Sequence, residues 1–325
     1  MKVAFAGSFA AQMIEPVRCR LTMPCDLVAD DEAGILAHLP DADILVSMKF
    51  STGMAEAAPN LRLVQVPGAG LDRIDPAALR PGVWLANAYG HETGIAEYIL
   101  GAMIALTRSF ARLDASLRQG HWDSQWAVGT NAPPLWPELG GKTLGILGFG
   151  RIGHAVARRA AAFGMRVCAV RSRPQADLPD GVDYVGGPDR IDDLLATADY
   201  LAVTLSLSAE TRGMMDATRI HAIKPGAFVI NVARAEIFNE AALYEALASR
   251  RLSGAALDVW YRYPTAPGPA APANLPFAGL DNVIMTPHVS GWTEGMLDAR
   301  AQLIAENIAR IARQERPANS IPRRS

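Results

Sequence analysis

Cysteine is scarce in this sequence, and the few that occur form no known pattern. Three cysteines stand among 325 residues, at Cys19, Cys25 and Cys168. Their spacing matches neither a metal-binding motif nor a redox motif, and an odd count argues against a disulfide framework. The sequence therefore predicts neither a metal site nor a disulfide scaffold.

A surplus of charge of one sign is also absent. The formal net charge is −2, a fifth of the residues are charged, and half are hydrophobic. Without a basic surplus, nothing in the composition favours binding to nucleic acid. The balance is typical of a soluble globular enzyme, and the length suffices for two domains.

Long hydrophobic runs are missing too. The most apolar helical stretch, residues 95–106, is interrupted by Glu97 and is too short to span a bilayer. The first residues, MKVAFAGSFAAQMIEP, faintly resemble a signal peptide, but their basic region is one lysine and their apolar run is short. We interpret residues 3–6 as a strand and expect a cytoplasmic protein with no membrane partner.

The most informative segment that is present is residues 142–173, KTLGILGFGRIGHAVARRAAAFGMRVCAVRSR. Its pattern predicts a strand at 144–147, a GxGxxG turn, a helix at 152–163 and a second strand at 167–170. In such a βαβ unit the glycines permit a tight turn, close approach of a pyrophosphate and close helix packing, and the helix N-terminus offers free N–H groups. The residues of this predicted dinucleotide site are Gly148, Phe149, Gly150, Arg151, Ile152 and Gly153.

The end of the second strand indicates which dinucleotide binds. A carboxylate for the ribose 2′-hydroxyl is expected there, roughly 20 residues after the turn. The sequence instead has Arg171, Ser172 and Arg173. Two guanidiniums and a hydroxyl would bind a 2′-phosphate, which a carboxylate would repel. We predict NADP(H) as the preferred coenzyme, with NAD(H) possible; the alternative is that these arginines are ordinary surface charge.

Short apolar runs alternate with helical segments along the whole chain, which predicts parallel α/β sheets. Before residue 90 the predicted strands are 44–48, 61–66 and 83–86. After residue 173 they are 200–205, 227–232, 255–259 and 283–285. Together with the βαβ unit the later strands predict a doubly wound parallel sheet, with its ligand at the carboxyl ends of the strands.

Three further segments connect these two sheets. Residues 90–118 have apolar side chains at helical spacing and predict one long helix from the first domain into the second. Residues 119–141 are a loop whose three tryptophans indicate packing, for instance on a partner subunit. Residues 293–314 predict a last helix that returns to the first domain.

Polar groups stand at three predicted strand ends, in Asn231-Val232-Ala233-Arg234, Asp258-Val259-Trp260 and Thr286-Pro287-His288-Val289-Ser290-Gly291. An arginine there can bind a carboxylate and polarise a neighbouring carbonyl. A histidine there can transfer the proton that accompanies hydride transfer. A lone histidine is more often structural. His288 is predicted to lie among the polar groups of the other two strand ends, and this favours a catalytic role.

These motifs resemble those of the D-isomer-specific 2-hydroxyacid dehydrogenases, the family of glyoxylate/hydroxypyruvate reductases, phosphoglycerate dehydrogenases and formate dehydrogenase. The resemblance covers nearly the whole chain and rests on LGFGRIG, LSLSAETRGMM, INVARAEIFNEAAL, GAALDVW and NVIMTPHVSG. It implies an α/β fold with a Rossmann coenzyme domain, residues 93–289. It also implies a smaller, discontinuous, flavodoxin-like substrate domain, residues 1–92 and 290–325. Family members are usually dimers held through the region matching 95–140, so we expect a homodimer.

The resemblance also implies roles for single residues. Arg234 matches the arginine that binds the substrate carboxylate and keto oxygen, His288 the acid/base, and Asp258 the aspartate that binds the nicotinamide carboxamide. Ala69, Gly70 and Asn87 match substrate-binding positions, although the turn at 67–70, judged by its residues alone, is equally explained as a plain connection. Further coenzyme contacts are expected from Thr204, Leu205, Val232, Ala233 and Gly291.

One position departs from the family pattern. Five residues after Asp258, most members have a glutamate paired with the histidine, and formate dehydrogenase has glutamine; here the residue is Tyr263. A carboxylate beside histidine favours the imidazolium, whereas a neutral phenol orients the ring without stabilising its charge as strongly. We expect His288 to remain the proton donor with a lower pKa. Alternatively, Glu236 or Glu294 supplies the missing acid, or Tyr263 shapes the substrate pocket.

The sequence therefore predicts an NADPH-dependent reductase of small 2-oxo acids, most plausibly glyoxylate or hydroxypyruvate. The alternative is a dinucleotide-sensing or interaction protein with reduced catalysis, which the missing glutamate favours and the intact Arg234 and His288 oppose.

Overall fold

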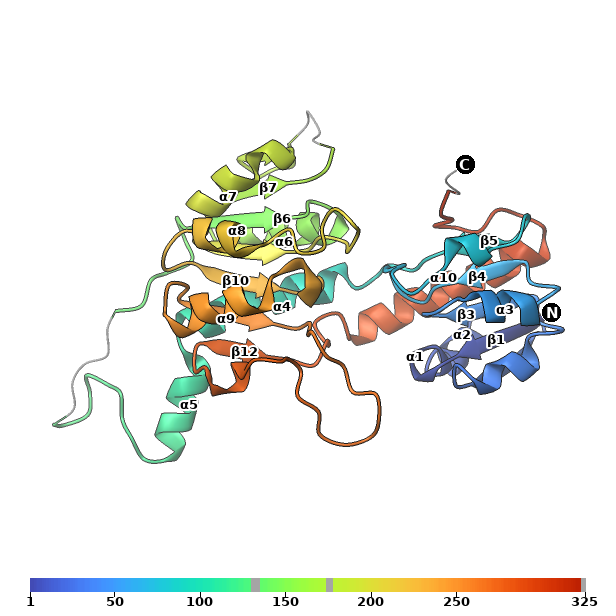
Figure 1. Ribbon diagram of the computed structural model, residues 1–325, viewed down its shortest axis with the longest axis horizontal. Coiled ribbons are helices and arrows are strands. Elements are labelled where there is room, and N and C mark those ends of the chain that lie inside the picture. Colours follow the sequence, from blue (N-terminus) through green and yellow to red (C-terminus); the bar gives the residue numbers. More distant parts are fainter. Residues whose placement is uncertain (130–134, 174–177, 323–325) are drawn as a thin grey trace. The chain divides into compact units, whose positions relative to one another are not determined.

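The computed structural model describes residues 1–129, 135–173 and 178–322. The described chain forms two compact units, one made of Met1–His91 with Trp292–Ser325 and the other of Glu92–Gly291. Each unit contains one parallel sheet covered by helices (Figure 1). The predicted α/β fold class is confirmed.

In the first unit the described residues form a five-stranded parallel sheet in the order β2-β1-β3-β4-β5. This is the flavodoxin-like order, in which the chain reverses direction beside its first strand. The strands are β1 (Lys2–Ala6), β2 (Asp26–Asp30), β3 (Ile44–Ser47), β4 (Leu63–Gln65) and β5 (Trp84–Ala86). The prediction from apolar runs missed β2, because only its middle residues are apolar and both ends are aspartates.

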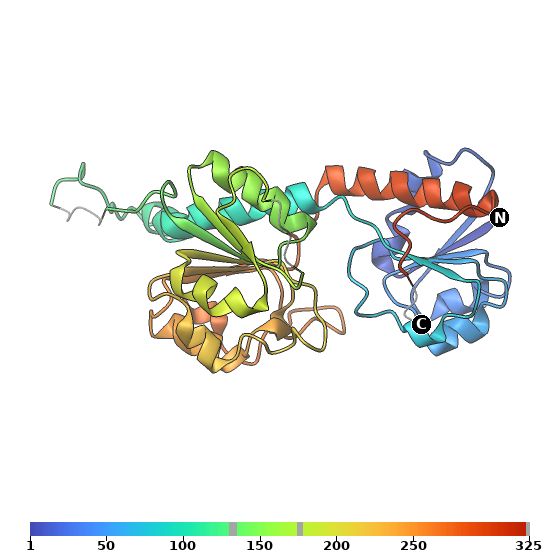
Figure 2. The same cartoon turned by 90° about the horizontal axis from the view of Figure 1, so that it is seen from above.

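Both faces of this sheet are buried, as the short apolar strands require. One face packs against α1 (Ser8–Ala11), α2 (Ile14–Arg18) and α10 (Glu294–Ala312), and the other against α3 (Thr52–Ala57) and the short 3₁₀ helices η1 (Gly34–His38) and η2 (Pro76–Ala78) (Figure 2). Alternate residues of a strand belong to the apolar cores on opposite faces of the sheet, with Phe5 on the α10 side and Ala4 on the other. The last helix thus belongs to the first unit.

In the second unit the described residues form a seven-stranded parallel sheet in the order β12-β11-β10-β9-β6-β7-β8. The chain reverses its direction of travel between β6 and β9, which is the switch point of a doubly wound fold. The strands are β6 (Thr143–Leu147), β7 (Arg166–Val170), β8 (Tyr184–Gly186), β9 (Tyr200–Val203), β10 (Phe228–Asn231), β11 (Gly254–Leu257) and β12 (Val283–Met285).

Helices cover both faces of this larger sheet (Figures 1 and 2). One face carries α4 (Glu92–Thr107) and α6 (Arg151–Ala162), and the opposite face carries α7 (Ile191–Thr197), α8 (Ala217–Ala222) and α9 (Glu240–Ala248). Short 3₁₀ helices lie at η3 (Pro188–Arg190), η4 (Ala235–Ile237) and η5 (Phe277–Gly279). No helix in the described ranges is both long and apolar enough to cross a membrane.

The predicted single helix over residues 90–118 is wrong. The structure has two helices there, α4, which ends at Thr107, and α5 (Phe110–Arg118). Ser109 between them has a φ of 52°, the left-handed conformation, which an L-residue cannot adopt inside a right-handed helix. The apolar spacing continued past this point, and the backbone break left no signal in it.

Candidate active site

The ends of six parallel strands lie in one row across the larger sheet. Their last residues pair in register from strand to strand, in the order Val170, Leu147, Val203, Asn231, Leu257 and Met285. The residue after each is therefore placed at the same carboxyl edge. These following residues are Arg171, Gly148, Thr204, Val232, Asp258 and Thr286, and most of them are residues predicted to bind the coenzyme.

The glycine-rich turn is packed tightly against the neighbouring strand end. Gly148 has a φ of 105°, and a Cβ there would lie 2.7 Å from the backbone nitrogen of Leu205. The Thr204 hydroxyl donates to the carbonyl of Gly148 over 2.6 Å. A Cβ on Gly153 would lie 2.9 Å from the same carbonyl, so helix α6 sits directly against the turn. Only glycine fits these two positions.

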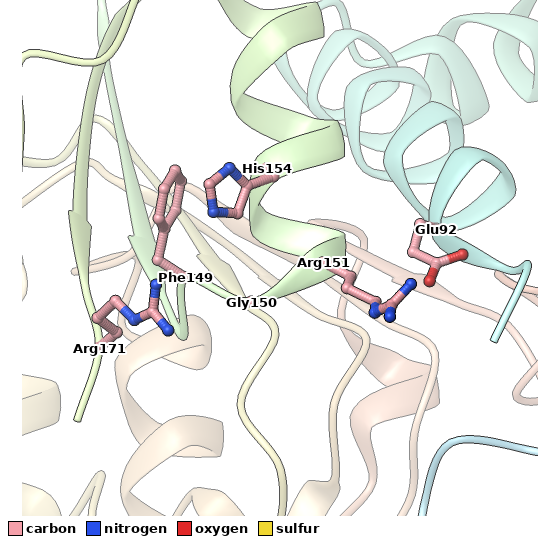
Figure 3. A pocket seen from close by; sticks show the side chains of 6 residues that line it. All are labelled: Glu92, Phe149, Gly150, Arg151, His154 and Arg171. Carbon is pink, nitrogen blue, oxygen red and sulfur yellow. The ribbon is translucent and has the colours of Figure 1, made fainter. Parts of the chain in front are cut away.

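Gly150 has the opposite environment. No atom lies within 4 Å of a Cβ built there, so the backbone at the start of α6 faces open space. This space is a pocket of about 620 Å³ lined by Glu92, Phe149, Gly150, Arg151, His154 and Arg171 (Figure 3). The open backbone, the helix N-terminus and the cationic lining suit the phosphates of a dinucleotide. The half-buried Ile152 follows on the same helix.

Arg171 reaches this pocket from the end of β7. The backbone N–H groups of Gly148 and Phe149 both donate to the carbonyl of Val170, which ties the strand end to the turn. In Figure 3 the Arg171 guanidinium lies beside the turn, whereas the Arg151 side chain points towards Glu92. Ser172 and Arg173 are exposed and do not line the pocket.

His154 is a pocket residue that the sequence analysis did not single out. Its ring lies 4.2 Å from the ring of the buried Phe149, centre to centre. Partial burial lowers the pKa of His154, and the positive charge of Arg171 lowers it further. Its position in the first turn of α6, directly after the glycine-rich turn, could have indicated that it lines the pocket.

Arg234 is held by the end of β10. The side chain of Asn231, which is buried, accepts from the backbone N–H of Ala233 and donates to the carbonyl of Arg234. Val232 and Ala233 are buried as well. Arg234 Nη1 donates to the carbonyl of Ala233 over 2.7 Å, which orients the guanidinium. Asn231 thus shapes the turn that presents Arg234, a role that sequence reasoning did not assign.

Tyr263 and His288 form a direct pair. The Tyr263 hydroxyl lies 2.8 Å from Nδ1 of His288, and both side chains are exposed. Partial burial raises the pKa of the half-exposed Tyr263 phenol, against the opposing effects of the Trp260 backbone and the charge of Arg234. The pair gives the His288 ring a hydrogen-bond partner at Nδ1.

The His288 loop is strained and clamped. His288 has a φ of 61°, which for a non-glycine residue costs roughly 1–2 kcal/mol. The carboxylate of Asp258, which is fully buried, accepts from the backbone N–H groups of Val289 at 2.9 Å and Ser290 at 2.8 Å. Asp258 therefore holds the segment that follows His288. Gly291 is the last residue of this unit.

The predicted substrate-binding residues belong to the first unit. The Asn87 side chain, which is buried, donates to the carbonyl of Ala69 over 3.0 Å, so the structure brings these two together next to Gly70. Among the residues described, no partner was found for the Asn87 Oδ1 atom, which leaves a buried acceptor at this turn. A buried acceptor without a donor is costly and suits a ligand that supplies one.

Known proteins of similar sequence match most of this chain. Residues 100–290 match the model of the D-isomer specific 2-hydroxyacid dehydrogenase NAD binding domain. The chain is 35% identical over 265 residues to the hydroxypyruvate reductase of Thermotoga maritima, covering 80% of this chain and 81% of that one. It is 34% identical to the D-3-phosphoglycerate dehydrogenase of Methanocaldococcus jannaschii over 88% of this chain, but spans only 53% of that relative.

A solved structure shows the same fold over nearly the whole chain. A D-isomer specific 2-hydroxyacid dehydrogenase from Xanthobacter autotrophicus, in complex with NADPH, superposes with a TM-score of 0.78 at 25% identity. The alignment covers 99% of this chain and 97% of that one.

Proposed function

Because the chain belongs to the D-isomer-specific 2-hydroxyacid dehydrogenase family, we propose that it reduces small 2-oxo acids to D-2-hydroxy acids with NADPH. The observation that carries this proposal is the single row of strand ends. One sheet edge presents the glycine-rich turn after β6, Arg171 after β7, and the turns after β10 and β12 that bear Arg234 and His288. A coenzyme and the groups that handle a 2-oxo acid are then held on one scaffold.

The residues divide the chemistry between them. The nicotinamide, when bound, supplies the hydride. The Arg234 guanidinium binds the substrate carboxylate and polarises the keto oxygen. The His288 imidazolium donates a proton to that oxygen from Nε2 and becomes neutral, while its Nδ1–H stays hydrogen-bonded to the Tyr263 oxygen. Ala69, Gly70 and Asn87 are the further residues that we propose for substrate binding.

The coenzyme preference rests on the pocket. Arg171 stands where a carboxylate would bind the 2′-hydroxyl of NAD(H), and it lines the pocket beside the turn. Exposed Ser172 and Arg173 follow it and are available to a 2′-phosphate. The NADPH complex of the Xanthobacter relative is consistent with NADP(H) as the preferred coenzyme, with NAD(H) as the weaker alternative.

Glyoxylate and hydroxypyruvate are the proposed substrates. The hydroxypyruvate reductase of Thermotoga maritima supports this choice, since it matches this chain over most of both lengths. The D-3-phosphoglycerate dehydrogenase is about twice as long as the matched region, so a phosphorylated substrate has less support. Tyr263, in the place of the family glutamate, favours a second candidate, a dinucleotide sensor with reduced catalysis.

The deciding experiment is oxidation of NADPH and NADH, side by side, with glyoxylate and hydroxypyruvate across a pH series. Turnover with NADPH preferred is the expected result. Binding of NADPH without turnover of any 2-oxo acid would favour the sensor instead. His288→Gln is the matched inactive control, because glutamine keeps a hydrogen-bonding group but transfers no proton at neutral pH.

We also propose a cytoplasmic homodimer held through α5 and the segment after it. Apolar side chains gather there on the surface: Phe110, Leu117, Trp122, Trp126 and Val128 are all more than half exposed. Exposed apolar groups at this density suit a subunit interface. Trp136 in the same connection lies over the guanidinium of Arg108.

A further inference from the structure

A chain of hydrogen bonds leads from helix α4 to the loop that bears His288. The Tyr98 hydroxyl on α4 lies 2.7 Å from the hydroxyl of Thr286, which lies 2.6 Å from Oδ1 of Asp258. The same carboxylate holds the backbone N–H groups of Val289 and Ser290. Two hydroxyl groups thus connect a core helix to the clamp behind His288.

The chemistry of these groups determines which one donates in each hydrogen bond. An ionised carboxylate only accepts, so the single proton of the Thr286 hydroxyl goes to Asp258. Thr286 must then accept from Tyr98, which donates. Burial raises the pKa of the Tyr98 phenol, so it keeps the proton that it donates. Each of the two hydroxyl groups therefore donates to one acceptor. The bond from Thr286 is the third that the Asp258 carboxylate accepts, besides those from Val289 and Ser290, and it fixes the Asp258 rotamer.

The loop is held on both sides of His288. Before it, the carbonyl of Thr286 accepts from Nε1 of Trp260 over 2.8 Å. After it, Asp258 holds Val289 and Ser290. The His288 backbone between these anchors is left-handed, a conformation that persists only when its surroundings impose it. Loss of one anchor would release the imidazole from its orientation.

We propose that Tyr98 and Thr286 are positioning residues for His288, acting through Asp258. The proposal rests on the proposed function in that His288 is the proton donor. Neither side chain needs to touch substrate. Their hydroxyl groups keep the Asp258 carboxylate turned towards the His288 loop, so the aspartate serves as a loop clamp besides its expected contact with the nicotinamide.

The test compares Thr286→Val, Thr286→Ser and Tyr98→Phe with matched controls in a second hydroxyl pair, which joins α4 to β9. The Tyr200 hydroxyl lies 2.7 Å from Thr107 on α4, and Thr107 donates to the carbonyl of Met103. This is the same donor order in a buried pair whose hydrogen bonds, within the described part of the chain, do not lead to Asp258. Tyr200→Phe and Thr107→Val therefore measure how far activity falls when a bond of this kind is lost while the hydrogen bonds to Asp258 remain.

We expect Thr286→Val to lower kcat about tenfold or more, the loss typical of one hydrogen bond to a charged group, with a smaller change in KM for the 2-oxo acid. Tyr98→Phe should lower kcat about threefold. Thr286→Ser should restore kcat to within about threefold of wild type, since the hydroxyl is kept. The two control variants should retain wild-type kcat at matched thermal midpoints.

A second readout does not need turnover. The full-length protein, labelled with ¹³C at histidine Cε1, gives a pH titration of His288, assigned by its loss in His288→Gln. We expect this titration to shift in Thr286→Val and to stay at its wild-type position in Thr107→Val. An unchanged His288 titration, or a Thr286→Ser as impaired as Thr286→Val, would overturn the inference. An inactive wild type would instead reject the proposed function and leave this titration as the deciding measurement.

Discussion

The Tyr263 hydroxyl lies 2.8 Å from Nδ1 of His288, where the family resemblance places a glutamate. A carboxylate can only accept a hydrogen bond from Nδ1, whereas a phenol can also donate a hydrogen bond to it. The phenol is also uncharged, so it does not stabilise the imidazolium as a carboxylate does. The pair therefore stabilises neutral imidazole better than a carboxylate would.

Replacing Tyr263 should move the pH dependence of reduction. Tyr263→Glu should shift the alkaline decline of activity upward by about 1 pH unit or more, because a neighbouring negative charge favours the imidazolium. Initial rates from pH 5 to 10 would measure the shift. Tyr261→Phe, at a tyrosine whose hydroxyl binds the carbonyl of Phe238, is the control. An unchanged profile in Tyr263→Glu would mean that another group sets the pH dependence.

Arg171 should decide between the two coenzymes. Arg171→Asp should weaken NADPH binding about tenfold or more and improve NADH binding, since the carboxylate repels a 2′-phosphate and accepts from a 2′-hydroxyl. Fluorescence titration with each coenzyme would measure both affinities. Arg158→Ser removes an exposed arginine of α6 that does not line the pocket, and should leave the preference unchanged. Equal losses in both variants would contradict a specific role for Arg171.

Gly148 should tolerate no side chain. Gly148→Ala should destabilise the fold by at least about 2 kcal/mol, because alanine is strained at a φ of 105° and its methyl group would meet the Leu205 backbone. Urea unfolding followed by circular dichroism would measure the loss. Gly53→Ala, where no atom lies within 4 Å of the new Cβ, should change stability by no more than about 0.5 kcal/mol.

His154 should make stability sensitive to mild acid. Its pKa in the folded protein is lowered, first by burial and then by Arg171, so the unfolded chain binds this proton more readily. Stability from the neutral ring is therefore present above the unfolded pKa, about 6.5, and is lost as the pH falls towards the folded value. Thermal midpoints from pH 8 to 5 should decline less in His154→Gln than in wild type. A parallel decline in both would show that other groups cause it, and His221→Gln, an exposed change on α8, serves as the control.

The oligomeric state should depend on α5. Leu117→Glu should convert the expected homodimer to a monomer, because it places a charge on the apolar surface of that helix. Sedimentation velocity at several concentrations would detect the change. Leu178→Glu, at another exposed leucine outside this segment, should remain dimeric. A wild type that is monomeric throughout would reject the interface.

The fold class and the position of the glycine-rich turn follow from local patterns in the sequence. Buried parallel strands appear as short apolar runs, and the glycines of residues 148–153 are dictated by backbone geometry and close packing, which are local properties. The place of Arg171 in the pocket was likewise predictable, because this residue follows its strand directly. What local pattern could not show was the break at Ser109, since a left-handed residue leaves the apolar spacing intact.

Which polar groups meet depends on how distant segments pack together. Tyr98, Thr286 and Asp258 are separated by long stretches of chain and come together because parallel strands end in register beside α4. The same packing turned Asp258 into the clamp of a strained loop and placed Tyr263 on His288. Such contacts depend on the side-chain positions of several elements at once, and no single segment of the sequence contains that information.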